Sequence, residues 1–189
     1  MSAPRLRRLL DAALADLASV LAAVREDEVD GLVDAVLAAQ SVFCAGRGRS
    51  ELQVRGFAMR LMHLGLRSFV VGETTTPAIG PGDVLVVASG TAATRTLLPI
   101  AERARQAGAR VALLTATPAG PLARAADILV SIEAPASRLD PFTPGASVLP
   151  MGSRFELSLA ILLDVVAVQI LARREVTVAA MFARHANLE

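Results

Sequence analysis

Hydroxyl-bearing side chains gather directly after one strongly apolar run of this sequence. The segment Val84–Leu98 (VLVVASGTAATRTLL) begins with β-branched residues, turns abruptly polar, and carries the hydroxyls of Ser89, Thr91, Thr94 and Thr96. A buried strand that leads into a turn and then a helix exposes backbone N–H groups, and the helix dipole adds partial positive charge. The segment therefore suits an anion. From this segment alone, however, an ordinary turn in which Thr91 or Thr94 caps the helix is the favoured interpretation.

Two further polar loops follow apolar, strand-like runs. They are residues 46–50 (GRGRS) and Gly72–Pro77 (GETTTP). In open parallel sheets, ligands bind outside the carboxyl ends of the strands, where such loops lie. Glycine, hydroxyl groups and arginine in these loops are the groups that a phosphorylated small molecule requires.

The first of these loops is similar to part of a dinucleotide-binding fingerprint. Gly46 and Gly48 have the required spacing, but Glu51 occupies the place of the third glycine. A carboxylate there would lie near the pyrophosphate, which argues against a nicotinamide cofactor. Arg49 and Ser50, following Gly48 at the start of a helix, suit a single phosphate group better.

Four ionisable side chains in the chain are candidates for chemistry or burial. Glu156 lies in a first helical turn after the break at residues 150–152, so it either complements the helix dipole or acts as a general base. His185, near the C-terminus, is by itself typical of an exposed histidine without a role. We expect His63 to be structural. We expect Asp164 to be a buried polar residue that meets a helix end or a subunit partner and has no role in chemistry.

The composition limits the classes of function. The 189 residues suit one domain, and a hydrophobic content of 53% indicates that some apolar surface is buried between subunits. The net charge of +1 argues against nucleic acid or an anionic membrane as a partner. The chain has no lysine, which excludes Schiff-base chemistry and a P-loop lysine. Cys44 is the only cysteine and lies in an apolar run, so we expect a buried, inert thiol and no thiolate metal cluster.

Neither the N-terminal segment nor the most apolar segment of the sequence predicts membrane insertion. Charges interrupt the N-terminal run, which is therefore no signal peptide. The most apolar segment, Leu157–Ala172, is short for a membrane span and carries Asp164. We interpret it as a buried helix of a cytoplasmic protein.

Hydrophobic periodicity predicts an α/β architecture, a three-layer αβα sandwich with a five-stranded parallel sheet preceded by two N-terminal helices. The strands are apolar throughout, which is typical of a sheet covered on both faces, and helices separate them. The expected strands are Ser41–Ala45, Ser68–Val71, Val84–Ala88, Arg110–Thr115 and Asp127–Ile132. The expected helices are Arg5–Val24, Glu28–Ala39, Ser50–Gly65, Thr94–Gly108, Pro121–Ala126, Ser153–Arg174 and Thr177–Arg184.

The order of these elements predicts a single domain over residues 1–189. Its parts are the N-terminal helices (4–39), the αβα core (41–132), a loop (133–149) and the C-terminal helices (153–184). The loop is rich in proline and is long enough to have a function or to move, although a plain surface excursion is equally consistent with it.

Several motifs, in order along the chain, resemble those of the 6-phospho-3-hexuloisomerases in the sugar isomerase (SIS) domain family. The resemblance spans Phe43 to the C-terminus. It is carried by Phe57–Gly65 (FAMRLMHLG), Gly72–Pro77 (GETTTP), Pro150-Met151-Gly152 with Phe155-Glu156, and Arg184-His185-x-Asn187-Leu188.

This resemblance implies interconversion of D-arabino-3-hexulose 6-phosphate and fructose 6-phosphate in the ribulose monophosphate route of formaldehyde fixation. The reaction passes through an enediol without metal or redox cofactor. Glu156 matches the family's catalytic base, and His185 matches a histidine that another subunit of a homotetramer supplies. Arg49 is a candidate for stabilising the enediolate oxygens. The phosphate is expected at Gly48, Arg49, Ser50, Ser89, Thr91 and Thr94.

Two departures from the family pattern bear on phosphate affinity. Ala92 replaces a glycine of the phosphate loop, which would strain the loop if the position needs a positive φ. Glu51 adds a negative charge beside the same pocket. The alternatives to the isomerase are a non-catalytic SIS module that senses a sugar phosphate and an isomerase for another phosphosugar. Retention of Glu156 and His185 argues against the sensor, and the tail argues against the other substrate.

Overall fold

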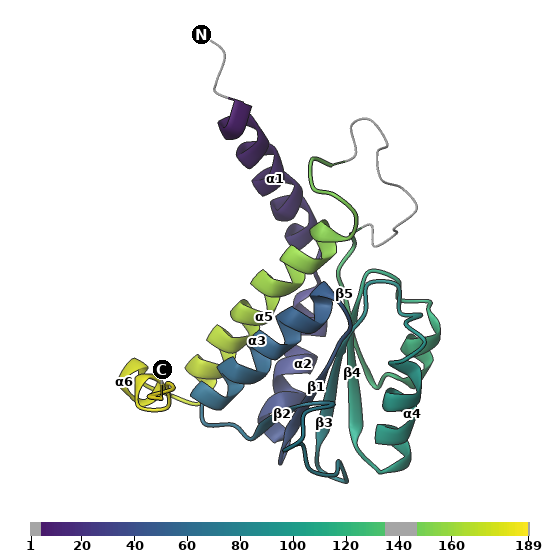
Figure 1. The fold of residues 1–189 in the computed structure, drawn as a ribbon, viewed down its shortest axis with the longest axis vertical. Helices are drawn as coiled ribbons and strands as arrows, with labels where there is room; N and C mark the ends of the chain where they lie inside the picture. The colour runs from purple at the N-terminus through teal and green to yellow at the C-terminus, as the bar shows by residue number, and fades with distance from the viewer. Residues whose placement is uncertain (1–4, 135–146, 189) are drawn as a thin grey trace.

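Five parallel strands form one sheet in the computed structural model, which describes residues 5–134 and 147–188 (Figure 1). The strand order is β2-β1-β3-β4-β5, and every neighbouring pair is parallel. The strands are β1 Val42–Ala45, β2 Ser68–Val70, β3 Val84–Ala88, β4 Arg110–Thr115 and β5 Ile128–Ser131. The predicted five-stranded parallel sheet is thus confirmed.

Each central strand contributes side chains to two separate cores because successive residues point to opposite faces of the sheet. In β1, Val42 and Cys44 belong to the larger core, whereas Phe43 and Ala45 belong to the smaller one. The sheet is therefore covered on both sides, which explains why β1 and β3 are buried along their whole length.

The two faces of the sheet carry unequal helical layers. The larger core is covered by helices α1 Arg5–Ala22, α2 Glu26–Ala38, α3 Arg49–His63 and α5 Ser153–Arg173. The opposite face is covered by α4 Leu98–Gln106 and the 3₁₀ helix η1 Pro121–Ala125. The short helix α6, Val178–Phe182, follows α5 near the C-terminus (Figure 1). This is the predicted αβα sandwich with two N-terminal helices.

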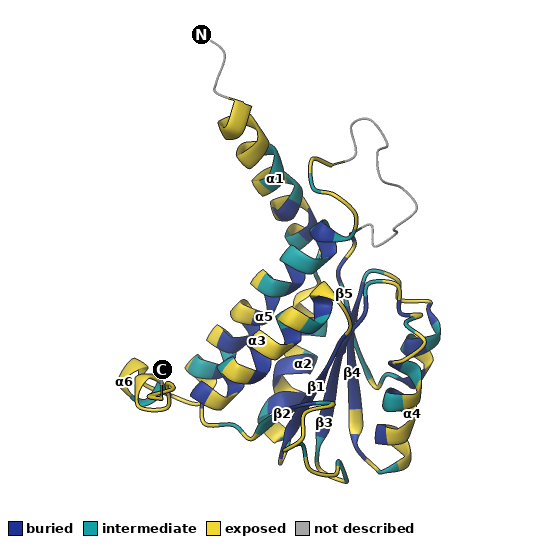
Figure 2. Ribbon diagram, in the orientation of Figure 1, coloured by how far each residue is buried: buried dark blue, intermediate teal, exposed yellow. Residues whose placement is uncertain are grey.

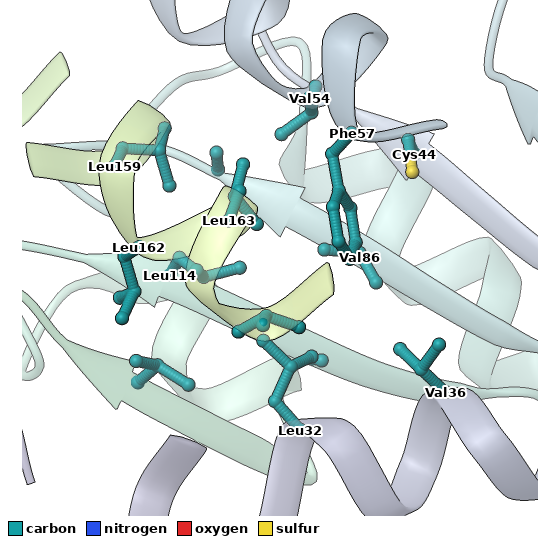
Figure 3. Close-up of a cluster of buried hydrophobic side chains, with 14 of the residues drawn as sticks. Leu32, Val36, Cys44, Val54, Phe57, Val86, Leu114, Leu159, Leu162 and Leu163 are labelled. Atoms are coloured by element: carbon teal, nitrogen blue, oxygen red, sulfur yellow. The ribbon is translucent and has the colours of Figure 1, made fainter. Parts of the chain in front are cut away.

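Close packing of α2, α3 and α5 on the sheet holds the larger core together (Figure 3). Leu32 of α2, Phe57 of α3 and Leu163 of α5 meet around Val86 and Leu114 of the sheet. Burying an aliphatic or aromatic side chain of this size contributes about 1.5–3 kcal/mol. The core therefore fixes α3 against α5, the two helices that carry Arg49, Ser50 and Glu156.

One predicted helix start was wrong. Helix α4 begins at Leu98 rather than Thr94, because residues 94–97 form a turn in which the Leu97 N–H donates to the Thr94 carbonyl at 3.0 Å. Pro99 in the first turn favours this later start, since proline needs no intrahelical acceptor there. The predicted short helix at Pro121–Ala126 is confirmed as the 3₁₀ helix η1.

Helix α5 is the one helix, within the described residues, that is long and apolar enough to cross a membrane. Of its most apolar 18-residue window, 44% is buried inside the molecule. Leu159 and Ile170 are completely buried in the larger core. These contacts are those of a core helix, as the sequence predicts for Leu157–Ala172. Most of the predicted loop 133–149 lies outside the described residues.

Candidate active site at the carboxyl end of the sheet

The neighbouring strands β1 and β3 form a switch point in the sheet. From β1 the chain passes through α3, on one face, to the edge strand β2; from β3 it passes through α4, on the other face, to β4 (Figure 1). Ala45, the last residue of β1, pairs with Val87. The loops that follow β1 and β3 thus start about 4.8 Å apart and diverge. Such a crevice is where doubly wound sheets bind ligands.

Two glycines shape the β1–α3 turn for packing reasons. A side chain on Gly46 would lie 2.7 Å from the Cα atom and 2.8 Å from the amide nitrogen of Glu51, so only glycine fits. Gly48 adopts a φ of +62° at the N-cap of α3, which favours glycine. The turn places Arg49 and Ser50 in the first turn of α3, where N–H groups have no intrahelical acceptor. The glycines are therefore explained without a dinucleotide.

Arg49 and Glu156 form an ion pair that joins the first turns of α3 and α5. The Arg49 Nε donates to Glu156 Oε2 at 2.5 Å, across 107 positions of sequence. The Arg49 side chain is 56% exposed, whereas that of Glu156 is 17% exposed. Glu156 also lies in the positive field of the α5 N-terminus. The pair combines a partly buried carboxylate with a cation that still faces solvent, as proton transfer beside a developing oxyanion requires.

The loop after β3 is an exposed turn held in shape by its own hydroxyls. Ser89 Oγ lies 2.9 Å from Thr94 Oγ1, and Thr91 Oγ1 accepts from the Ala93 N–H at 3.3 Å. In the part of the chain that the structure describes, the N–H groups of Gly90, Thr91 and Thr94 donate no hydrogen bond. Unused donors beside hydroxyl groups are suited to an anion. The alternative of a simple helix cap is wrong, because the N-cap of α4 is Leu97 and no side chain caps the helix.

Two threonines outside the predicted site support this loop. Thr115 Oγ1 and Thr117 Oγ1 donate to the carbonyl of Gly90 at 3.2 and 3.1 Å. The Ala116 N–H donates to the same carbonyl. The sequence offers a weak signal for them, since both threonines lie at the carboxyl end of the strand that pairs with β3.

Ala92 does adopt the left-handed conformation for which the family prefers glycine. Its φ is +48°, which costs an alanine about 1–2 kcal/mol. The residue is fully buried, and its Cβ lies 2.5 Å from where a side chain on Gly120 would begin. Its carbonyl accepts from the Leu122 N–H at 2.9 Å. The methyl group therefore packs into the smaller core and does not line the exposed surface of the loop.

Backbone strain of this kind occurs on both sides of the candidate site. Met151, in the turn before Glu156, has a φ of +54°. Of the three described non-glycine residues with positive φ, Ala92 and Met151 border the site, and Glu175 lies beyond the end of α5. Strained residues persist where the surrounding structure holds them, and they cluster at functional sites.

Arg55 neutralises the unexpected carboxylate of Glu51. Its Nη1 lies 3.3 Å from Glu51 Oε1, and its Nη2 donates to Glu73 Oε1 at 2.5 Å. Glu73 belongs to the loop Gly72–Pro77. Thr76 Oγ1 donates to the Val70 carbonyl at 2.6 Å, and this hydrogen bond holds the loop against β2. The sequence signal for Arg55 is its position four residues after Glu51, a spacing that favours an ion pair on a helix.

His185 lies at the opposite end of α3 from Glu156. Its ring stacks on that of His63, with centroids 5.4 Å apart and planes 14° from parallel. Arg49 begins α3 and His63 ends it, so a helix of 15 residues separates the two groups by about 20 Å. Burial and the nearby charges of His185 and Arg60 lower the pKa of His63. Within one chain, the structure therefore does not bring His185 to Glu156.

Two other residues can be compared with their predictions. Within its own chain Asp164 is not buried, because its side chain is 70% exposed and lies 3.5 Å from Arg60 Nε. Its burial against a partner subunit stays a prediction. The prediction for Cys44 is confirmed, since it is completely buried and burial raises its thiol pKa to about 12. A thiol of that pKa is no nucleophile near neutral pH.

An apolar cavity of about 390 Å³ lies away from these charges, between α4 and the loop after β2. Phe43, Leu85 and Ile100 line it, and Arg103 is its only charged side chain. A hydroxylated anion needs several polar partners, so this cavity does not suit one.

Comparison with known proteins identifies relatives along almost the whole chain. A family model described as the SIS domain matches residues 36–153. The 3-hexulose-6-phosphate isomerase of Bacillus subtilis is 35% identical over 177 residues, which cover 93% of this chain and 95% of that protein. The enzyme of the same name from Mycobacterium gastri is 41% identical over 174 residues, with coverages of 92% and 86%.

Solved structures are similar in fold over the same length. A Methanococcus jannaschii protein, whose crystal structure infers a function of 3-hexulose-6-phosphate isomerase, is 32% identical with a TM-score of 0.82. The match covers 95% of this chain and 98% of that one. Vibrio vulnificus NanR, solved with ManNAc-6P, has a TM-score of 0.73 at 17% identity and coverages of 97% and 66%. That likeness concerns the fold alone.

Proposed function

This chain belongs to the SIS domain family, and we propose that it interconverts D-arabino-3-hexulose 6-phosphate and fructose 6-phosphate. The resemblance found in the sequence motifs is confirmed by relatives named 3-hexulose-6-phosphate isomerase, and the chain is a phosphosugar isomerase. The particular substrate follows from those names together with the chemistry of the site. The ribulose monophosphate pathway of formaldehyde assimilation is the context that this activity implies.

The observation that carries the proposal is the Arg49–Glu156 ion pair at the first turns of α3 and α5. A base that removes a proton from carbon must be ionised and close to a group that stabilises the negative charge formed on oxygen. Glu156 supplies the carboxylate. The terminal nitrogens of Arg49, which have no partner among the described residues, supply donors for the substrate oxygens.

In the proposed reaction, Glu156 removes the proton from C2 of the 3-ketose. The electron pair of that C–H bond forms the C2–C3 double bond, the π electrons of the C3 carbonyl move to its oxygen, and His185 donates a proton to that oxygen, which gives the enediol. Glu156 then returns its proton to C3, while the C2 hydroxyl gives its proton back to His185 and its O–H electron pair forms the C2 ketone. The electrons stay within the substrate, so the step needs no redox cofactor. His185 assists ring opening or proton transfer between the oxygens.

The phosphate binds, in this proposal, in the crevice between the two loops that leave β1 and β3. Ser89, Thr91 and Thr94 contribute hydroxyls, and the unused N–H groups of their loop add donors. On the other side, the turn at Gly48 and the first turn of α3 contribute further donors, including those of Arg49 and Ser50.

His185 reaches a site of another subunit in this proposal, because α3 separates it from Glu156 of its own chain. Large apolar side chains on α1 and α5 support a homo-oligomer, and the family resemblance implies a tetramer. Leu6 and Leu14 of α1 are 69% and 64% exposed, and Val168 of α5 is 64% exposed. Helix α1 extends well beyond the sheet, with its first turns exposed (Figure 2). Large exposed apolar side chains on two helices are typical of a surface that another subunit covers.

Other expectations remain part of the same proposal. The protein acts in the cytoplasm on a small soluble substrate, without nucleic acid or membrane as a partner. Residues 1–189 form one SIS domain.

A coupled assay on arabino-3-hexulose 6-phosphate tests the proposal, with Glu156→Gln as the decisive variant. Glutamine keeps the shape and removes the base, so we expect kcat to fall about 10²–10⁴-fold with fructose 6-phosphate binding retained. Glu26→Gln is the matched control, because Glu26 also lies in the first turn of a helix, α2, and is not one of the residues assigned to the site. It should leave kcat unchanged.

Three results would contradict the proposal in different ways. Binding of fructose 6-phosphate without turnover would favour a sensor of sugar phosphates. Turnover of a different phosphosugar alone would retain the isomerase chemistry and change the substrate. Full activity of Glu156→Gln would show that Glu156 is not the catalytic base.

A further inference from the structure

The C-terminal tail contacts the end of α3 through a stack between two histidine rings, His63 of α3 and His185 of the tail. His63 is 6% exposed, and among the described residues its ring nitrogens make no hydrogen bond. Its one ring contact is the near-parallel stack on His185. The stack on His185 is therefore the contact that accounts for an aromatic ring at this position.

A second, independent contact fixes the residue beside His185. Arg184 Nη1 donates to the carbonyl of His63 at 3.3 Å and to that of Ala180 at 2.9 Å. It thereby caps the C-terminus of α3, where unpaired carbonyls and the dipole favour a cation. The guanidinium also covers Gly65, since a side chain there would lie 3.1 Å from the Arg184 Cζ atom. Gly65 has a φ of +80°, so both its backbone conformation and the space left by Arg184 favour glycine.

We propose that His63, Gly65 and Arg184 form a dock that holds the His185 ring in the orientation in which a neighbouring subunit uses it. This inference rests on the proposed function, in which His185 acts at another subunit's site. His63 is a positioning residue in this view, because it touches His185 and not the substrate. One face of the His185 ring is covered by the stack, and the residue is exposed in its own chain.

Positioning of this kind acts on the rate of the chemical step. A histidine on a loose tail samples many orientations and loses conformational entropy when it adopts the reactive one. If the folded protein already holds the ring in that orientation, this entropy loss no longer adds to the activation free energy. Loss of the dock should therefore lower kcat and leave KM unchanged, because the phosphate grip lies at the other end of α3. A defect in folding or assembly would instead lower the amount of active protein.

Two substitutions at His63 separate these cases. In the full-length protein, we expect His63→Ala to lower kcat about 10-fold with KM unchanged. We expect His63→Phe to restore most of kcat, because phenylalanine keeps a flat ring for stacking and the imidazole nitrogens of His63 have no bonds to lose. Equal loss in both variants would overturn the dock. So would a rise in KM with kcat retained.

The His185→Ala background provides the sharpest test. If His63 acts through His185, then adding His63→Ala to His185→Ala causes no further loss of kcat, since the positioned ring is already absent. Multiplied losses would overturn the proposal. A readout that needs no activity is the ring-current shift of the His185 imidazole protons in NMR spectra, which should disappear in His63→Ala and persist in His63→Phe.

These arms distinguish the two proposals. If the wild-type protein turns over no arabino-3-hexulose 6-phosphate, the proposed function fails and the dock is judged by the NMR shift. If the wild type is active, Glu156→Gln is inactive and His63→Ala is fully active, only the dock fails.

Discussion

The two ends of helix α3 make different kinds of contact with other parts of the chain. At the N-terminal end, Gly46 and Gly48 bring the chain into the helix so tightly that Arg49 meets Glu156 of α5. At the C-terminal end, the carbonyl of His63 is capped by Arg184, and the ring of His63 carries His185. One end offers unpaired N–H groups and positive potential, and the other offers carbonyls and accepts a cation.

This difference has a consequence for the proposed catalysis. A rigid helix of 15 residues keeps the two ends about 20 Å apart, so no adjustment of side chains unites Glu156 and His185 within one chain. If both residues act in one site, two chains must provide them. The apolar surface left on α1 and α5 is consistent with such an assembly.

The largest effect is expected when Glu156 and His185 are substituted in different chains. Glu156→Gln and His185→Ala should each abolish most of the activity, and unfolding and refolding them together should restore it. In a randomly mixed oligomer, about one quarter of the sites would draw both native residues from different chains. The measurement is turnover of arabino-3-hexulose 6-phosphate before and after mixing.

The matched control is the double variant Glu156→Gln with His185→Ala, refolded with wild type at the same ratio. No recovery from the mixed single variants, although they assemble together, would show that the two ends serve different sites.

A smaller effect is expected from the charges next to the N-terminal end. Arg55→Gln frees the Glu51 carboxylate, which should repel the phosphate dianion and raise KM about 3–10-fold at low ionic strength, with less effect in high salt. Glu51→Gln added to Arg55→Gln should return KM to near the wild-type value. A KM that stays high in the double variant would instead assign the role of Arg55 to its bond with Glu73.

The smallest effect concerns the stability of the C-terminal end as the pH falls. The pKa of His63 is lowered in the folded protein by burial and by His185 and Arg60, and Arg184 adds another nearby cation. Below about pH 6.5, the unfolded chain binds a proton that the folded chain resists, so this group makes stability decline as pH falls.

His63→Phe lacks that proton equilibrium. Its Tm relative to wild type should therefore increase by about a degree between pH 7 and pH 5, measured by thermal unfolding. A constant difference across this range would mean that His63 does not titrate differently in the folded and unfolded states.

Much of the architecture could be predicted from local sequence pattern. Continuous apolar runs such as Val84–Ala88 were predicted to be strands of a doubly covered parallel sheet, and they are. The positions of Arg49 and Glu156 in first helical turns were also predictable, since a glycine-rich break precedes each of them. The sequence also identified Ala92 as a position that would be strained if it needs a positive φ, and its φ is +48°.

Predictions failed where a local signal was weaker than its three-dimensional surroundings. The threonines before α4 have helix-compatible neighbours, but their hydroxyls and the Gly90 carbonyl bond within the turn and to the next strand. Asp164 interrupts an apolar run, and within its own chain it is exposed and lies beside Arg60 rather than a helix end. Neither outcome can be deduced from the residue and its immediate neighbours.

The sequence by itself determined which segments are strands and helices, because burial on two faces or on one stripe leaves a short period in the chain. It also determined which residue types were available for proton transfer and anion binding. The tertiary structure alone decided that β1 lies beside β3, that Arg49 meets Glu156, and that His185 lies with His63 at the far end of α3. These are contacts between distant parts of the chain, and only the packing of helices on the sheet determines which distant groups meet.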